Sequence, residues 1–375
     1  MMQPAPPAPI PVSLLTGFLG SGKTTLLNAL LKHEGMSDTA VIVNEFGEIG
    51  IDHLLVEQVD EGILEMSSGC LCCTIRGDLV NTLEDLLRRL DNHRIKPFAR
   101  VVIETTGLAD PAPILHTIMT HPYLVMRYRL SAIVTTIDAI NGMSTLDEQS
   151  ESVKQAAVAD RLVLTKTDLL EDEDDLAPLG TRLKALNPAA PQLIAAKDEA
   201  SPEKLFDAGL YDPATKSPNV QRWLNEEAYK GKNHHHDQHH HDINRHDERI
   251  EAFCLTRENP VSESAFQMFI ELLQAEYGKG LLRLKGIVAL REDPDHPRVI
   301  HAVQHVLHPP ARLENWPDDD RRTRLVFIMR DVNKKLIADL FNAFVDPHTT
   351  QSAAIAANMD NPLSLNPGRG LLDEG

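Results

Sequence analysis

The sequence is poor in several features that mark whole classes of protein. It has only four cysteines in 375 residues, and three of them fall within four positions, which argues against a disulfide framework. No apolar run reaches the roughly 18 residues that a membrane-spanning helix needs. The first nine residues contain no lysine or arginine and therefore do not resemble a signal peptide. We expect a cytoplasmic protein without a membrane partner.

Basic residues are also scarce. Lysine and arginine total 37 against 55 aspartates and glutamates, which gives a net charge of −18. Proteins that bind nucleic acid neutralise its phosphates with basic patches, so we expect no nucleic-acid partner. The remaining composition is that of a globular protein, and the length is sufficient for two domains.

The strongest motif is Gly17-Phe-Leu-Gly-Ser-Gly-Lys-Thr24. It lies between the strand pattern of residues 10–16 and the helix pattern of residues 25–32, which favours a phosphate-binding loop over a Gly-rich turn. Backbone N–H groups and the helix N-terminus would bind phosphate, Lys23 would neutralise β- and γ-phosphate oxygens, and Thr24 would bind Mg²⁺. The loop residues predicted to bind the nucleotide are Gly17, Gly20, Ser21, Gly22, Lys23, Thr24 and Thr25.

Strand and helix patterns alternate from residue 10 to about 210, with a hairpin expected within 54–66. This alternation predicts an α/β fold of the P-loop GTPase type, with a mostly parallel sheet covered by helices on both faces. Right-handed crossovers place ligands at the carboxyl ends of the strands, where the phosphate loop, Glu104 and Asp168 all fall.

A second domain follows a change in composition. Its strand patterns at 249–255, 281–290, 299–307 and 324–329, with helices at 263–277 and 332–344, predict a smaller α+β domain with an antiparallel sheet. The expected organisation is a flexible Pro-rich lead-in (1–9), a nucleotide domain (10–210), a His-rich linker (211–247), the second domain (248–345) and a disordered tail (346–375).

Thr165-Lys-Thr-Asp168 stands where a GTPase recognises guanine. Asp168 can accept two hydrogen bonds from guanine that adenine cannot supply, and the stem of Lys166 would lie against the base. Thr165 replaces the usual asparagine, so we expect one amide contact to be lost. GTP is favoured over ATP; the alternative is a Lys-x-Asp sequence on a solvated loop.

Glu104-Thr-Thr-Gly107 follows an apolar strand. Glu104 would hold the hydration shell of Mg²⁺ or the attacking water, and the Gly107 N–H would contact the γ-phosphate. Lys23, Glu104 and Gly107 form the predicted catalytic set, although a strand-capping glutamate is the simpler alternative. No glutamine or arginine finger stands at a recognisable position, so we expect slow hydrolysis.

The cysteines of Gly69-Cys-Leu-Cys-Cys73 predict a metal site. Thiolates at Cys70, Cys72 and Cys73 suit tetrahedral Zn²⁺, with Co²⁺ as an alternative. In extended backbone Cys73 projects opposite the other two, and a turn there would bring its sulfur round. Glu48 is a candidate oxygen ligand. Buried structural cysteines and a redox pair are the other readings of this cluster.

Histidines supply a second, looser metal feature. Exposed imidazoles on a flexible segment capture transition metals with little selectivity, which indicates a reservoir or sensor; a merely polar linker is the alternative. These residues are His234, His235, His236, His239, His240 and His241. His301, His305 and His308 are expected to be surface residues.

Together the motifs resemble the CobW/YjiA family of metal-handling P-loop GTPases. The resemblance rests on the four motifs above and on Asn44-Glu-Phe-Gly-Glu48, while Arg283-Leu-Lys-Gly286, Gln304 and Trp316 resemble the family's C-terminal domain. It implies a GTPase that binds a metal at the three clustered cysteines and delivers it to a client metalloprotein. Some members carry glutamate where this chain has Val43. A homodimer is one further arrangement that the resemblance allows.

The sequence therefore predicts a GTP-hydrolysing metallochaperone with GTP, Mg²⁺ and zinc as its ligands. GTP–Mg²⁺ would order residues 45–52 and the cysteine segment, and so raise the affinity for metal. The alternatives are a cobalt chaperone for cobalamin biosynthesis and a metal buffer with a structural nucleotide site. A kinase or ligase ranks last, because no acceptor-substrate site is evident.

Overall fold

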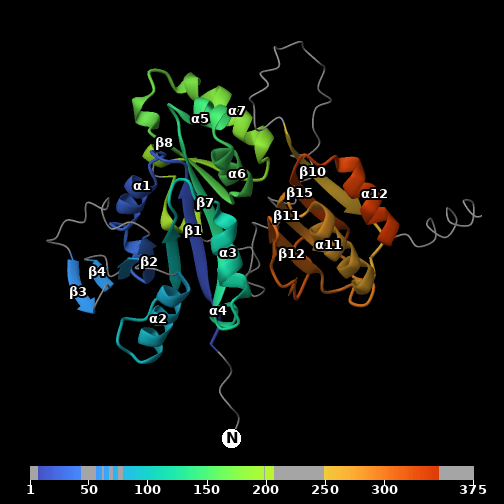
Figure 1. The fold of residues 1–375 in the computed structure, drawn as a ribbon, viewed down its shortest axis with the longest axis horizontal. Coiled ribbons are helices and arrows are strands. Elements are labelled where there is room, and N and C mark those ends of the chain that lie inside the picture. The colour runs from blue at the N-terminus through green and yellow to red at the C-terminus, as the bar shows by residue number, and fades with distance from the viewer. Residues whose placement is uncertain are drawn as a thin grey trace, which may run out of the picture.

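The computed structural model describes residues 7–43, 56–60, 63–66, 71–74, 79–197, 199–206 and 249–345, with the three short strands between 56 and 74 described by their backbone (Figure 1). Several predicted features lie outside these residues. They are the segment 44–52 with Glu48, Cys70, the six clustered histidines and the tail 346–375.

The first sheet has nine strands in the order β3-β4-β5-β2-β6-β1-β7-β8-β9. The strands from β5 to β9 in this order run parallel, and the β3–β4 hairpin adds antiparallel strands at one edge. The mostly parallel sheet and the hairpin are thus as expected. The strands are β1 (Ile10–Gly17), β2 (Thr39–Val43), β3 (Val56–Asp60), β4 (Ile63–Met66), β5 (Leu71–Thr74), β6 (Arg100–Glu104), β7 (Tyr128–Asp138), β8 (Arg161–Thr165) and β9 (Gln192–Ile194).

Helices cover both faces of this sheet. Successive side chains of a buried apolar strand point to opposite faces, so both faces are apolar and each needs a layer of helices. In β1, Leu14 packs into the core beneath one group of helices and Leu15 into the core on the other side. The first group comprises α2 (Leu79–Asp91), α3 (Pro111–Thr120), α4 (Leu124–Arg127), α5 (Gly142–Glu148), α6 (Ser150–Val158) and α7 (Leu176–Leu186); the second comprises α1 (Lys23–Leu30) and α8 (Pro202–Phe206). Within the described residues, no helix has the length and apolarity to cross a bilayer.

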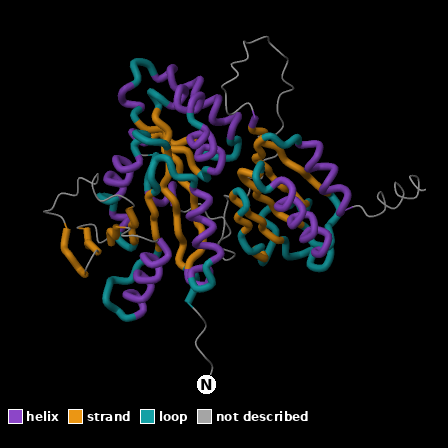
Figure 2. Tube along the Cα trace, in the orientation of Figure 1, coloured by secondary structure: helices purple, strands orange, loops and turns teal. Residues whose placement is uncertain are grey.

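The second sheet is antiparallel, in the order β10-β15-β11-β12-β13 with β14 beside β12. Its helices α11 and α12 pack on one face of this sheet. Figure 2 shows the strands of the second domain as a group apart from those of the first sheet. The elements are β10 (Ile250–Arg257), α11 (Glu263–Tyr277), β11 (Leu281–Val288), β12 (Arg298–Val303), β13 (Val306–Leu307), β14 (Ala311–Arg312), β15 (Thr323–Arg330) and α12 (Lys334–Val345).

One predicted strand of this domain is wrong in detail. The pattern over 299–307 predicts one continuous strand, but a two-residue turn at Gln304 and His305 divides it into β12 and β13, which pair as a hairpin. The sequence Gln-His carries none of the glycine, asparagine or proline that normally marks such a turn. The turn is therefore invisible to pattern reading.

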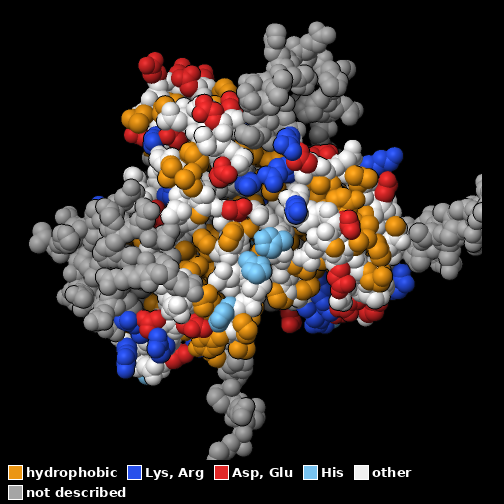
Figure 3. Space-filling model, in the orientation of Figure 1, with side chains coloured by type: hydrophobic (Ala, Val, Ile, Leu, Met, Phe, Trp, Pro, Cys, Tyr) orange, Lys and Arg blue, Asp and Glu red, His pale blue; other side chains and the backbone are white. Residues whose placement is uncertain are grey.

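The free face of the second sheet packs against the first domain. Leu282, Val303 and Ile328 belong to the same apolar core as the helices of the first domain. Helix α6 contacts β11, α3 contacts β13, and α7 contacts β10. On the face drawn in Figure 3, histidine side chains lie near the middle of the molecule.

A buried charge cluster lies within this contact. Asp160 accepts a hydrogen bond of 2.9 Å from the backbone N–H of Ile133, and its other oxygen accepts from Arg283 and Lys285 of the second domain. Burial alone would raise the pKa of Asp160, but the two cations hold it well below its ordinary value. One carboxylate of the first domain is thus bound by two cations of the second.

Two histidines complete the cluster, contrary to the expected surface placement. His301 and His308 are each 3% exposed, and their rings stack with centroids 4.7 Å apart. Burial lowers the pKa of His301 to about 4 and that of His308 to about 2. His305 alone of the three is exposed, as expected. The alternation of side chains along β12 places His301 on the face that meets the first domain.

The buried histidines predict a loss of stability in mild acid. As the pH falls from 6.5 towards about 4, the unfolded chain binds protons that folded His301 does not, so the folded state loses stability. Each such histidine contributes up to about 1.4 kcal/mol per pH unit. Urea titrations at pH 7 and pH 5 measure this slope, and His301→Phe should flatten it; equal slopes in the two proteins would contradict the assignment.

Candidate nucleotide-binding site

The phosphate loop connects β1 to α1. Gly17 has φ 143°, and a Cβ there would lie 2.3 Å from Thr136 Oγ1, so no larger residue fits. Lys23 is the first residue of α1, and its Nζ donates hydrogen bonds of 3.0 Å to the carbonyls of Gly17 and Phe18. The amine therefore lies within the curl of the loop, where a phosphate would bind.

Buried hydroxyls join this loop to the sheet beneath it. Ser21 Oγ and Thr136 Oγ1 share a hydrogen bond of 2.7 Å, and Thr136 Oγ1 lies 3.3 Å from the carbonyl of Thr16, to which it donates. Thr105 Oγ1 donates to Thr16 Oγ1 at 2.9 Å. The side chain of Ser21 is thus directed into the protein, where it stabilises the loop, and the predicted contact of Ser21 with the nucleotide would be made by its backbone.

Thr165 has the same role at the end of β8. Its hydroxyl oxygen lies 2.8 Å from the carbonyl oxygen of Ser21 and 3.1 Å from that of Ile137, which share its one hydrogen, and the residue is 6% exposed. The sequence suggested that threonine here loses a contact to the base. In the structure this residue instead connects the base-recognition segment to the phosphate loop.

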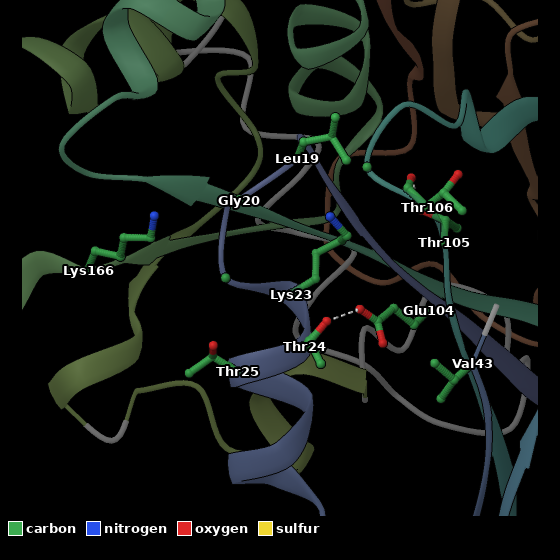
Figure 4. A pocket seen from close by; sticks show the side chains of 12 residues that line it. Leu19, Gly20, Lys23, Thr24, Thr25, Val43, Glu104, Thr105, Thr106 and Lys166 are labelled. Carbon is green, nitrogen blue, oxygen red and sulfur yellow. Dashed lines mark hydrogen bonds between the residues drawn. The ribbon is translucent and has the colours of Figure 1, made fainter. Parts of the chain in front are cut away.

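Two oxygen groups meet across the site. Thr24 Oγ1 donates a hydrogen bond of 2.8 Å to Glu104 Oε1 (Figure 4). Glu104 ends β6 and is 6% exposed, so its carboxylate is held in place by the sheet. A hydroxyl and a carboxylate are the hard oxygen donors that Mg²⁺ prefers, and the pair therefore fits that ion.

The segment after Glu104 lies directly against the phosphate loop. A Cβ on Gly107 would lie 2.6 Å from the backbone nitrogen of Leu19, so the close approach requires glycine. Leu19 and Leu108, one on each segment, are both 57% exposed. The two segments predicted to contact the γ-phosphate are thus already side by side.

These groups enclose a cavity of about 370 Å³. Most of the predicted nucleotide and catalytic residues line it, whereas Gly17, Ser21, Thr165 and Asp168 do not; Leu19, Val43, Thr105 and Thr106 are additional. The complete lining is Leu19, Gly20, Gly22, Lys23, Thr24, Thr25, Val43, Glu104, Thr105, Thr106, Gly107 and Lys166. The sequence analysis assigned these four residues no role, because Leu19, Thr105 and Thr106 occupy variable positions of their motifs and Val43 is an apolar residue at the end of a strand.

Lys166 lies at one end of the cavity (Figure 4). Its Nζ contacts Asp138 Oδ2 at 2.7 Å, and Asn141 donates to the same oxygen at 3.0 Å. Burial would raise the pKa of Asp138, but these hydrogen bonds hold it below its ordinary value. Asp138 was missed, although an acid directly after the apolar run 130–137 is the same signal that identified Glu104. Asp168 is exposed in the short 3₁₀ helix Thr167–Leu169.

Strand register locates two of the three clustered cysteines. Cys73 in β5 pairs with Ile42 in β2, which pairs with Ile103 in β6, the residue before Glu104. Two strand spacings separate Cys73 from Ile103, or about 10 Å between backbones. The strand continues through Cys73 to Thr74, so the turn considered at Cys73 is not there.

Comparison with known proteins agrees with this geometry. Residues 11–194 match the model of the CobW/HypB/UreG nucleotide-binding domain, and residues 250–345 match the cobalamin synthesis protein cobW C-terminal domain. The zinc chaperone YjiA of Escherichia coli is 32% identical over 320 residues, which cover 85% of this chain and 94% of that one.

The chain belongs to the CobW family of P-loop GTPases. The zinc chaperone CobW of Sinorhizobium is 26% identical to this CobW-family chain over 376 residues, covering 90% of it and 97% of the relative. The crystal structure of Zn(II)-bound YjiA GTPase from E. coli superposes with a TM-score of 0.68 at 30% identity, covering 90% of this chain and 99% of the other. The fold and the family predicted from the motifs are confirmed.

Proposed function

We propose that this CobW-family chain binds GTP with Mg²⁺, hydrolyses it slowly, and uses the cycle to hold zinc and deliver it to a client metalloprotein. The observation that carries the proposal is a convergence at one sheet edge. The Thr24–Glu104 contact crosses a cavity lined by the phosphate loop, and β5, with two of the clustered cysteines, lies two strands from β6. A metal site there would be close enough to respond to the γ-phosphate.

The residues predicted to bind the nucleotide and to catalyse its hydrolysis have separate parts in this proposal. On nucleotide binding, Lys23 exchanges its contacts with the loop carbonyls for phosphate oxygens, a charge-assisted interaction. Thr24 and Glu104 would hold Mg²⁺, which offsets the negative charge that develops on the phosphates. Glu104 also orients the attacking water, and the Gly107 N–H donates to the γ-phosphate. Thr165, Lys166 and Asp168 set the position of the base.

Zinc would be the cargo of this cycle. Cys70, Cys72 and Cys73 are the candidate thiolates, and because adjacent residues of the extended β5 project to opposite faces, β5 would have to rearrange for all three to bind one ion. Glu48 is the candidate fourth ligand, and the clustered histidines capture metal loosely. Zinc is favoured over cobalt because several relatives are named zinc chaperones or zinc-regulated GTPase metalloprotein activators. GTP would order the segment 45–52 and the cysteine strand, and hydrolysis would release the metal.

Phosphate release and zinc transfer test this proposal against the metal-buffer alternative. Without an arginine finger we expect GTP turnover on the order of 10⁻³ per second or slower, with ATP turned over less. Transfer of zinc from the full chain to an apo-metalloenzyme, followed by recovery of that enzyme's activity, should need GTP. A metal buffer with a structural nucleotide site would not hydrolyse GTP, and its transfer of zinc would be the same with and without GTP.

A further inference from the structure

The turn between β12 and β13 has an unusual backbone. Gln304 has φ 51°, in the left-handed region that side-chain-bearing residues rarely adopt, and its N–H donates to the carbonyl of Leu282 at 3.0 Å. Glycine would take this conformation with less strain. A strained residue often marks a position whose side chain has a function.

The side chain of Gln304 reaches the other domain. Its Nε2 contacts both carboxylate oxygens of Asp110, at 2.7 and 3.0 Å. Asp110 is the N-cap of α3 and accepts a hydrogen bond of 3.0 Å from the N–H of Ala112. It also ends the short segment that begins at Glu104 and passes through Gly107. The second domain therefore binds the far end of the segment that contacts the phosphate loop.

A second glutamine binds the middle of the same segment. Gln155 in α6 is 1% exposed, and its Nε2 donates to the carbonyls of Gly107 and Ala109, each at 3.1 Å. Its Oε1 is buried and accepts from no group among the described residues. Since buried acceptors are normally paired, the amide has capacity for an N–H that a rearranged segment would offer.

The second domain is also attached at a point that is part of the sheet. Asp160, bound by Arg283 and Lys285, accepts from the backbone of β7. Helix α6, which carries Gln155, contacts β11, the strand of both cations. Among its contacts with the first domain, the second domain thus has a polar contact with the sheet, through Asp160, and another with the segment beside the nucleotide site, through Gln304.

We propose that Gln304 is a positioning residue for Gly107, through which the second domain stabilises the segment in the place where it meets the γ-phosphate. The inference rests on the proposed GTP site. Such coupling is reciprocal. A ligand that moves the β12–β13 turn must therefore change the affinity for GTP, and GTP must change the affinity for that ligand by the same factor. This assigns a role to Gln304, which the resemblance to the C-terminal domain left without one.

The test compares nucleotide affinities in full-length variants. GDP has no γ-phosphate. The ratio of the GDP dissociation constant to that of the GTP analogue therefore measures how much the contacts of the γ-phosphate, including that with Gly107, add to the affinity. In Gln304→Gly, which suits the backbone and removes the amide, this ratio should fall at least threefold. Asparagine tolerates the left-handed backbone but is one methylene shorter, so the ratio in Gln304→Asn should lie between those of wild type and Gln304→Gly.

A matched control is available in the same domain. Asp331 also has a left-handed backbone, with φ 59°, and its side chain pairs with Arg249. Asp331→Gly should leave the ratio unchanged. Asp110→Ser keeps a capping oxygen for α3 but withdraws the carboxylate; it should reproduce the effect of Gln304→Gly, and the double variant should add nothing.

A ratio within 1.5-fold of wild type in Gln304→Gly and Asp110→Ser would overturn the role of Gln304. Thermal melting reports whether each variant folds; if Gln304→Gly does not fold, the ratio in Gln304→Asn decides. Failure of the proposed function gives a different result, since wild-type protein would then not bind the GTP analogue at all.

Discussion

Lys23→Ala is expected to raise the dissociation constant for GTP about 100-fold. The residue is 8% exposed, and its amine donates to two loop carbonyls, so the loop directs the amine to where phosphate oxygens would lie. A charge-assisted hydrogen bond contributes about 1.5–3 kcal/mol, and each 1.4 kcal/mol is about tenfold in affinity. Titration of a fluorescent GTP analogue measures the change.

Lys32→Ala is the matched control for this variant. Lys32 follows α1 and is exposed, so its loss removes the same charge without touching the cavity. Its affinity for the analogue should match that of wild type. If Lys23→Ala bound the analogue within threefold of wild type, the loop would not be a triphosphate site.

Cys72→Ser is expected to weaken zinc binding at least tenfold while nucleotide affinity stays within twofold. A serine hydroxyl is a far poorer zinc ligand than a thiolate, and Cys72 lies in β5, beyond β2 from the strand that ends at Glu104. Zinc affinity should be measured against a chelator of similar strength, because the clustered histidines bind metal weakly and would otherwise contribute.

The fourth cysteine provides the control for that experiment. Cys254 lies in β10 of the second domain, and Cys254→Ser should leave zinc affinity unchanged. A Cys72→Ser protein that kept wild-type zinc affinity but melted at lower temperature would support the alternative of buried structural cysteines instead.

Local patterns were sufficient for much of the fold. The helix predicted over 263–277 has those bounds in the structure as α11, because both its apolar spacing and its N-cap, Ser262, are features of the local sequence. The phosphate loop was equally visible, since its glycines, Lys23 and Thr24 are contiguous. The contact of Thr24 with Glu104 followed from one topological rule, that parallel strands end at the same edge.

Contacts between distant segments were not predictable in this way. The sequence predicted that threonine at 165 loses an amide contact to the base, but it gave no sign that the Thr165 hydroxyl binds Ser21, 144 positions earlier in the chain. His301 and His308 were expected at the surface because they are polar and scattered along the chain, and the packing of the second sheet on the first domain buries them. Gln304 lies in a turn without turn residues, and its partner Asp110 belongs to the other domain.

The most direct test of the account is a zinc titration of the full chain with and without a non-hydrolysable GTP analogue. If the triphosphate and the cysteine strand share one sheet edge as proposed, the analogue should lower the zinc dissociation constant at least fivefold, a coupling of about 1 kcal/mol. Zinc should then lower the dissociation constant of the analogue by the same factor. Equal zinc affinities in the two titrations would contradict the coupling.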